Sequence, residues 1–192
     1  MGISVNSEND FWVFAYGSLM WRPGFDYVEC KSAKLYGHHR AFCVFSYYHR
    51  GTPEHPGLVL GLERGGSCRG LAYRVRGSQA EAVRDYLRAR EQVTMIYLEV
   101  MGRVHILEDV LELSGPRERK DALCFIVDRK HEQYAGKLSF DEQVHLIARG
   151  KGRSGENPEY LANTLQHLEE MGIADEGLKL LWRAVSQVRE HG

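Results

Sequence analysis

A glutamate at the end of an apolar helix stripe is the residue in this sequence best suited to move a proton. Residues 78–81 (Ser-Gln-Ala-Glu) have the spacing of a capping box and predict a helix from 79 to about 91. Apolar side chains recur in it at helical spacing, at Ala80, Val83 and Leu87. Glu91 continues that stripe. Burial and the negative end of the helix dipole both raise a carboxyl pKa, so we expect Glu91 to act as a general base or acid.

A second interpretation of Glu91 stays open. Arg88 lies three residues earlier, a spacing at which oppositely charged side chains meet on a helix surface. In that case Glu91 would be one half of an ion pair on an exposed helix end.

The turn Tyr16-Gly17-Ser18-Leu19 interrupts an aromatic and apolar run that begins at Phe11. The residue types favour a strand over 11–16, and Gly17 is the first residue that permits a positive φ or a close backbone approach. We expect the backbone N–H groups of this turn to face a pocket and to bind an anionic group there. Ser18 lacks the G-x-S-x-G spacing of a nucleophile, so we expect it to bind rather than attack. A purely structural bend is the alternative.

Other groups of polar residues have weaker chemical signatures. Residues 49–57 hold two prolines and two glycines, which predicts an ordered loop with Gly51 and Gly57 as candidate hinges. Residues 150–155 resemble a phosphate-binding loop only in composition, because the G-x-x-x-x-G-K-[ST] spacing is missing; a helix end and a solvated loop is the simpler interpretation. The histidines and cysteines form no metal-binding pattern, so we expect no metal site.

The order of the predicted elements indicates an α+β protein. Extended segments come first, with the helix 79–91 among them: 11–16, 30–48, 58–63, 68–76, 95–113 and 122–127. We expect turns at 64–67 and 102–103 and a charged connector at 116–120. Three helices follow, the first from a second capping box at 139–142 to Gly150, the second from an Asn157 N-cap to Gly172, and the last from Asp175. Six or seven strands in this length could close into a barrel.

Composition limits what the chain binds. Its 192 residues suffice for one domain with a sizeable core, and we expect a flexible tail over 1–10 and a single domain over 11–192. A net charge of -1 offers no basic field for nucleic acid, and no apolar run approaches the roughly 20 residues that span a membrane. The polar N-terminus and four widely spaced cysteines predict a soluble cytoplasmic protein with reduced thiols.

Short segments spread over nearly the whole chain share the order and spacing of one known family. They are Val13-Phe14-Ala15-Tyr16-Gly17-Ser18-Leu19-Met20-Trp21, His49-Arg50-Gly51-Thr52-Pro53 through Pro56-Gly57, Gly65-Gly66-Ser67-Cys68-Arg69-Gly70, Arg90-Glu91, Asp128-Arg129-Lys130-His131 with Tyr134-Ala135-Gly136, and Asn157 to Leu161. Together they resemble the ChaC-type γ-glutamylcyclotransferases of the glutathione-specific class. Ala15 stands where that family usually has glycine.

The resemblance implies a small mixed β-barrel flanked by helices, and a reaction that converts glutathione into 5-oxoproline and Cys-Gly without a cofactor. It implies Glu91 as the catalytic acid/base. The expected substrate-binding residues are the strand end, the turn and two later residues: Val13, Phe14, Ala15, Tyr16, Gly17, Ser18, Leu19, Arg50 and Tyr160. Arg50 is expected to meet a substrate carboxylate. For Tyr160, a half-buried structural tyrosine is the alternative.

Two other functions stay open beside the glutathione-specific enzyme. The first is cyclotransfer on other γ-glutamyl peptides or amines. The second is a non-catalytic regulator of the cation-transport type on the same fold, which has no need for a protonatable Glu91 beside an intact turn. We expect glutathione as the small-molecule partner, no nucleic-acid or membrane partner, and a monomer or weak homodimer.

Overall fold

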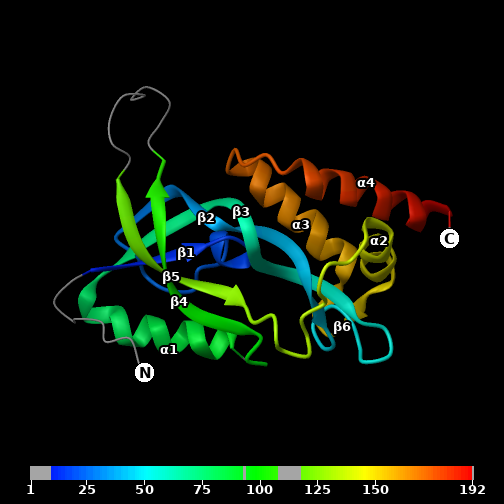
Figure 1. The fold of residues 1–192 in the computed structure, drawn as a ribbon, viewed down its shortest axis with the longest axis horizontal. Coiled ribbons are helices and arrows are strands. Elements are labelled where there is room, and N and C mark those ends of the chain that lie inside the picture. The colour runs from blue at the N-terminus through cyan, green and yellow to red at the C-terminus, as the bar shows by residue number, and fades with distance from the viewer. Residues whose placement is uncertain (1–9, 93, 108–117, 192) are drawn as a thin grey trace. The chain divides into compact units, whose positions relative to one another are not determined.

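Residues 10–92, 94–107 and 118–191 are described in the computed structural model of the chain (Figure 1). They fall into two compact units. The barrel unit comprises Met1–Arg40 and Leu62–Asp128, and the helical unit comprises Ala41–Gly61 and Arg129–Gly192. Within the described ranges, no helix has the length and apolar character needed to cross a bilayer.

The strands close into a mixed β-barrel. Its strand order is β1-β3-β2-β4-β5, formed by β1 (Phe11–Ala15), β2 (Glu29–Ser46), β3 (Gly57–Val75), β4 (Tyr97–Ile106) and β5 (Arg119–Val127). β1 pairs antiparallel with β3 on one side and parallel with β5 on the other. Every residue of β1 is buried, which explains its continuous apolar run in place of an alternating pattern. The predicted α+β class and small mixed barrel are confirmed.

The two turns predicted inside the strands are wrong. β3 continues through residues 64–67, where Gly65 (φ 100) and Gly66 (φ 65) take up left-handed backbone conformations within the strand. The strand continues on both sides of the pair, so the two glycines do not reverse the chain. β4 likewise continues through Gly102, where an added Cβ would lie 2.9 Å from the sulfur of Cys124. Gly102 therefore makes room for a neighbouring side chain.

One further boundary also differs from the expectation. Arg119 and Lys120, expected in a connector, begin β5. Residues 108–113, expected to be extended, and 116–117 of the connector lie outside the described residues, as do residues 1–9 of the expected tail. Asp10, at the end of that tail, accepts hydrogen bonds from Arg74 Nη1 (2.6 Å) and from the N–H of Gly77 (3.2 Å).

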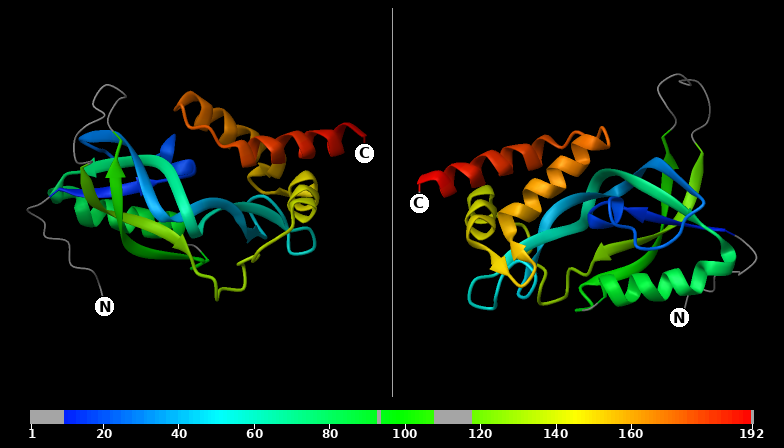
Figure 2. Two further views of the ribbon diagram at one scale, coloured as in Figure 1. Left: turned by 45° about the horizontal axis from the view of Figure 1, so that its top comes forward. Right: turned by 180° about the vertical axis from the view of Figure 1, so that it is seen from behind.

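Helix α1 (Ala80–Glu91) lies along the barrel strands (Figures 1 and 2). The predicted stripe is confirmed, since its buried residues include Ala80, Val83 and Leu87. The capping box at Ser78 is wrong, because residues 77–79 wind into a short 3₁₀ turn and no side chain caps the helix. Salt bridges attach α1 to β4 instead: Arg84 Nε and Arg88 Nε each lie 2.6 Å from a carboxylate oxygen of Glu99.

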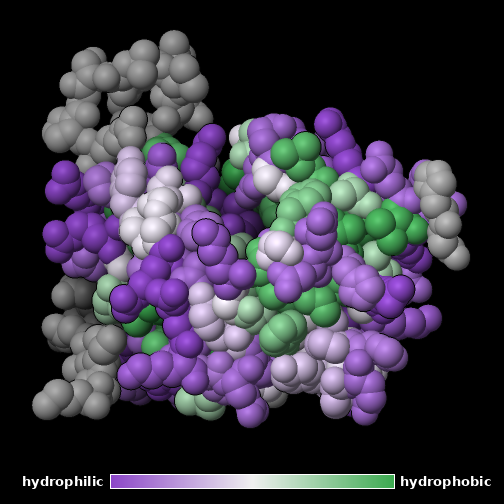
Figure 3. Space-filling model, turned by 45° about the vertical axis from the view of Figure 1, so that its right-hand side comes forward, coloured by the Kyte–Doolittle hydropathy of each residue, from purple (hydrophilic) through white to green (hydrophobic). Residues whose placement is uncertain are grey.

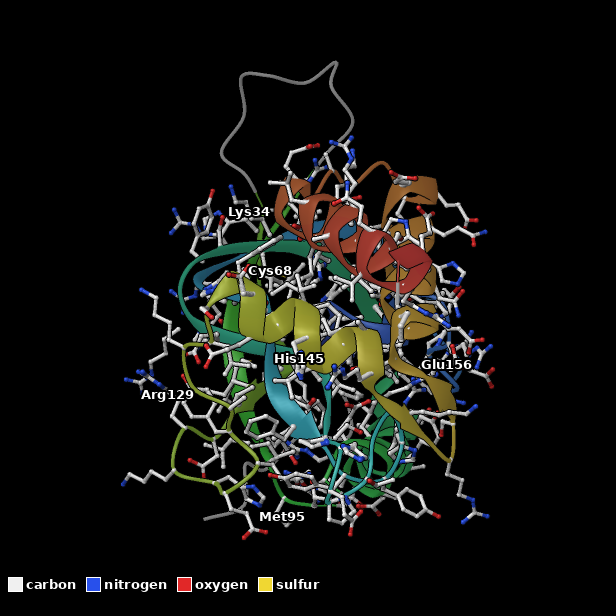
Figure 4. All side chains as sticks on the ribbon, turned by 90° about the vertical axis from the view of Figure 1, so that its right-hand side faces the viewer. Lys34, Cys68, Met95, Arg129, His145 and Glu156 are labelled. Atoms are coloured by element: carbon white, nitrogen blue, oxygen red, sulfur yellow. The ribbon has the colours of Figure 1, made fainter. Side chains whose placement is uncertain are left out.

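The helical unit contains α2 (Phe140–Arg149), α3 (Asn157–Glu170) and α4 (Glu176–His191), with a short pair of strands, β6 (Lys151–Gly152) and β7 (Gly155–Glu156), before α3. The second capping box is confirmed: Glu142 N–H donates to Ser139 Oγ, and Ser139 N–H donates to Glu142 Oε2. The helix ends at Gly150 and Gly172 and the Asp175 cap are confirmed as well. Figure 4 shows His145 on α2 and Glu156 just before α3.

The surface over α4 is partly apolar. Leu180 and Val188 are about half exposed there, while Leu178, Leu181 and Val185 on the same helix are buried. Figure 3 shows apolar areas between hydrophilic ones on the face that it brings forward.

Asn157 has a different role from the N-cap predicted for it. Glu156 is the N-cap residue, and Asn157 is wholly buried within α3. Its side-chain amide forms two hydrogen bonds with the backbone of Leu58: Oδ1 accepts from the N–H at 2.6 Å, and Nδ2 donates to the carbonyl at 2.8 Å. One amide thereby ties the start of α3 to the start of β3.

Close packing explains the glycines of the 49–57 loop better than hinge motion does. An added Cβ on Gly51 would lie 2.1 Å from the backbone nitrogen of Gly57. On Gly57 it would lie 2.2 Å from the carbonyl oxygen of Arg50. Both positions therefore require glycine because two backbone segments meet there.

Candidate active site

Glu91 is the last residue of α1, and its side chain is 17% exposed. Burial raises the pKa of this carboxyl, and the Arg90 guanidinium, with Nε 3.2 Å from Oε1, partly opposes that rise. The direction agrees with the expectation from the helix stripe. The alternative pair with Arg88 is not formed, because Arg88 binds Glu99 and also lies 3.5 Å from Asp85. Glu91 is therefore a largely buried carboxyl whose protonation responds to its surroundings.

The predicted turn follows β1 directly and forms a short 3₁₀ helix over Ser18–Met20. The N–H of Met20 donates to Gly17 O (2.8 Å), and the N–H of Arg22 donates to Ser18 O (2.9 Å). Gly17 has φ −134 and not the positive φ that we considered. In residues 10–92, 94–107 and 118–191, no group accepts a hydrogen bond from the N–H of Gly17, Ser18 or Leu19. Three successive backbone donors are thus available at the end of a buried strand.

Arg90 connects Glu91 with this turn. Its Nη2 donates to Ser18 Oγ (3.0 Å), its Nη1 donates to the carbonyl of Arg22 (2.5 Å), and its Nε faces Glu91. The structure therefore brings the predicted acid/base and the predicted binding turn together, one guanidinium apart. We assigned Arg90 no role from the sequence. The available signal was its place beside Glu91 in the Arg-Glu pair of the family resemblance.

Arg40 stabilises the other side of the turn and also escaped prediction. Its Nε donates to the carbonyl of Tyr16 (2.6 Å), and its Nη2 donates to that of Arg69 (2.8 Å). The hydroxyl of Tyr73 donates to the carbonyl of Met20 (2.7 Å). The donors to these carbonyls are residues distant in the sequence, so no local sequence pattern predicts the contacts.

The strand residues predicted to bind substrate are deeply buried. Val13, Phe14 and Ala15 are 0% exposed, and Tyr16 and Leu19 are also buried. Ser18 is partly exposed. The first three residues form the strand that holds the turn in place, and contact of their side chains with a substrate stays a prediction.

Arg50 and Tyr160 meet within the helical unit. The guanidinium carbon of Arg50 lies 5.3 Å from the centre of the Tyr160 ring, and Nη1 donates to the carbonyl of Glu156 (3.1 Å). The Tyr160 ring also packs edge-on against Phe42, with 5.9 Å between ring centres. Arg50 and Tyr160 are far apart in the sequence, and the fold brings them into contact. Their binding of a substrate stays a prediction.

The phosphate-loop interpretation of residues 150–155 fails on hydrogen bonding. The backbone N–H of Arg153 donates to Tyr48 O (2.8 Å), and that of Ser154 donates to His49 O (3.0 Å). These donors are occupied, and the segment pairs with itself as β6 and β7. For metals, the described residues contain no group of three His, Cys, Asp or Glu side chains placed to hold an ion.

Comparison with known proteins gives a consistent family. The model of the ChaC-like protein family matches residues 11–188. A glutathione-specific gamma-glutamylcyclotransferase of Escherichia coli is 35% identical over 181 residues, which cover 94% of this chain and 75% of that protein. A glutathione-specific gamma-glutamylcyclotransferase 1 of Danio rerio is 36% identical over 159 residues, or 82% of this chain and 78% of that protein.

A solved structure shares the fold over nearly its whole length. The crystal structure of a glutathione-specific gamma-glutamylcyclotransferase from yeast superposes with a TM-score of 0.83 and 28% identity, covering 95% of this chain and 98% of that one. The family match, the sequence relatives and this fold agree: the chain belongs to the ChaC-like protein family.

Proposed function

We propose that this protein is a glutathione-specific γ-glutamylcyclotransferase that releases 5-oxoproline and Cys-Gly. The observation that carries the proposal is the largely buried Glu91, joined through Arg90 to a turn with three available backbone N–H groups. The names of the Escherichia coli and Danio rerio relatives support glutathione as the substrate.

The proposed chemistry is an intramolecular aminolysis. The neutral α-amino group of the γ-glutamyl unit attacks the γ-carbonyl carbon of the same unit, and a five-membered lactam forms. The Glu91 carboxylate takes one proton from the attacking nitrogen. Protonated Glu91 then gives that proton to the cysteine nitrogen as its C–N bond breaks. The carboxylate is regenerated, and no water is consumed. A pKa raised toward neutrality suits both proton transfers.

The turn supplies what the developing charge requires. The tetrahedral intermediate carries an oxyanion, and the substrate's α-carboxylate carries a permanent negative charge. Backbone N–H groups of Gly17, Ser18 and Leu19 are donors of the kind that stabilise such charges without reorganising. Holding the γ-glutamyl unit bent also brings its two reacting atoms together, an effect of orientation.

Ser18 acts in this proposal as a binding residue. Its hydroxyl oxygen accepts a hydrogen bond from the cationic Arg90, whereas a nucleophilic serine needs a neighbouring base. Because the oxygen accepts from Arg90, the hydroxyl hydrogen is left to point elsewhere. A substrate carboxylate oxygen is the acceptor that we assign to it.

The test compares Glu91→Gln with Glu81→Gln, an exposed residue of the same helix. Each purified variant is incubated with glutathione and, in a second arm, with γ-glutamylalanine, and the 5-oxoproline released is measured. We expect a rate loss of at least about 100-fold for Glu91→Gln and wild-type rates for Glu81→Gln. Full activity of Glu91→Gln would refute the acid/base role. Equal turnover of glutathione and γ-glutamylalanine by the wild-type protein would refute specificity for glutathione.

A further inference from the structure

We propose that Arg90 is a positioning residue that holds the Ser18 turn against the end of α1 and favours the charged form of the Glu91 carboxylate. The inference rests on the proposed function, since it assigns a task to a residue beside the proposed acid/base. It goes beyond that function because it predicts separate effects for the charge of Arg90 and for its shape.

The contacts of Arg90 join three pieces of chain. Within α1, its Nη1 lies 3.0 Å from the hydroxyl oxygen of Tyr86, and its Nε lies 3.2 Å from Glu91 Oε1. Outside the helix, Nη2 donates to Ser18 Oγ, and Nη1 donates to the carbonyls of Arg22 (2.5 Å) and Pro23 (3.4 Å). The planar guanidinium has several donors in a fixed arrangement and so sets the spacing between the turn and the helix end.

The same contacts distinguish positioning from substrate binding. All three nitrogens of the Arg90 guanidinium already face acceptors of the protein, and the side chain is 23% exposed. A substrate carboxylate would have to displace these partners. Arg90 therefore acts on a substrate through Ser18 and Glu91.

The charge of Arg90 has its own effect on Glu91. Burial favours the neutral carboxyl, and a cation 3.2 Å away favours the carboxylate. Among the described residues, Arg90 is the charged group that acts on Glu91. The other arginines on this part of α1, Arg84 and Arg88, pair with Glu99 of β4. Removing the Arg90 charge should thus leave burial unopposed and make Glu91 harder to ionise.

Two substitutions separate charge from shape. Arg90→Met removes both, and the acid limb of the pH profile of kcat/KM should move to higher pH, because that limb reports a base that must be ionised in the free enzyme. Arg90→Lys keeps the positive charge and loses the planar arrangement of several donors. Its acid limb should stay in place while KM for glutathione rises about tenfold, the scale of one lost charge-assisted hydrogen bond. Arg103→Met is the control, since Arg103 is exposed on β4 and pairs with Asp121.

A measurement without substrate keeps this inference distinct from the proposed function. The Glu91 carboxyl is titrated by ¹³C NMR in wild type, Arg90→Met and Arg90→Lys, after circular dichroism has shown each to be folded. We expect the titration midpoint to rise in Arg90→Met only. An unchanged midpoint there, or an unchanged KM in Arg90→Lys, would overturn the inference. If Arg90→Met does not fold, an acid limb displaced in Arg90→Lys would overturn it as well. Failure of the proposed function would instead appear as full activity in Glu91→Gln.

Discussion

Replacing Asn157 with alanine tests how the helical unit is held together. Asn157 is 0% exposed, and its amide satisfies both backbone groups of Leu58, which is also 0% exposed. Asn157→Ala removes both partners and leaves a buried N–H and a buried C=O unpaired. We therefore expect a large loss of stability, although the residue touches no part of the proposed chemistry.

The size of the loss follows from the two orphaned groups. Each buried backbone group left without a partner costs about 1–3 kcal/mol, so the pair predicts a loss of roughly 2–6 kcal/mol. Water entering the space left by the amide would bring the value toward the lower end. The free energy of unfolding of an ordinary domain is about 5–15 kcal/mol, so a loss of this size is a substantial part of the total stability.

Chemical denaturation followed by circular dichroism measures the effect, and α3 offers a matched control. Asn163→Ala removes an exposed amide from the same helix, and we expect a change within about 0.5 kcal/mol. Asn157→Asp keeps the acceptor for Leu58 N–H but sets a carboxylate oxygen against the Leu58 carbonyl. It should be strongly destabilised at neutral pH and recover partly on acidification, because a protonated carboxyl can again donate.

Two outcomes would refute the stabilising role inferred for Asn157. If Asn157→Ala unfolded within about 0.5 kcal/mol of wild type at an unchanged denaturant slope, the two hydrogen bonds to Leu58 would not contribute as inferred. Equal losses for Asn157→Ala and Asn163→Ala would lead to the same conclusion.

Three further predictions concern other parts of the structure. Burial raises the folded-state pKa of Glu91 above the ordinary 4.5, so ionisation of Glu91 lowers the stability of the fold as pH rises. Glu91→Gln should therefore have a higher melting temperature than wild type at neutral pH, and the difference should vanish below pH 4.5. Equal melting temperatures at neutral pH would contradict this. Ser139→Ala should lower the free energy of unfolding by about 1 kcal/mol in urea denaturation. Ser78 caps no helix, so Ser78→Ala should lower it by less than about 0.5 kcal/mol. A larger loss for Ser78→Ala than for Ser139→Ala would count against the capping assignment. Gly70→Ala should lower the free energy of unfolding by about 2 kcal/mol or more, because its Cβ would lie 2.1 Å from the Ala15 carbonyl oxygen. An unchanged denaturation midpoint would show that β1 can move aside at little cost in free energy.

Features that depend on one stretch of chain followed from the sequence alone. The apolar run of β1, the stripe of α1 with Glu91 at its end and the capping box at Ser139 are confirmed. In each, the side-chain pattern within a single segment decides the conformation and the buried face. The same local pattern is sufficient to predict a raised pKa for the Glu91 carboxyl.

Glycines show where such local patterns stop being sufficient. Gly65 and Gly102 both looked like turn residues, and both lie within continuous strands. Gly65 supplies a left-handed conformation, and Gly102 makes room for Cys124. A glycine in the sequence carries all of these meanings, and the neighbouring strand decides among them.

Contacts between residues that are far apart in the sequence were decided by the tertiary structure. Arg90 reaches Ser18 across 72 positions of sequence, and Asn157 reaches Leu58 across 99. The donors of a guanidinium or an amide suit many acceptors, so residue type alone does not choose a partner. The choice is made when strands and helices pack and bring one particular acceptor within about 3 Å. The sequence predicts which residue could move a proton and which turn could bind an anion, whereas the position of Arg90 between them depends on the packing of the fold.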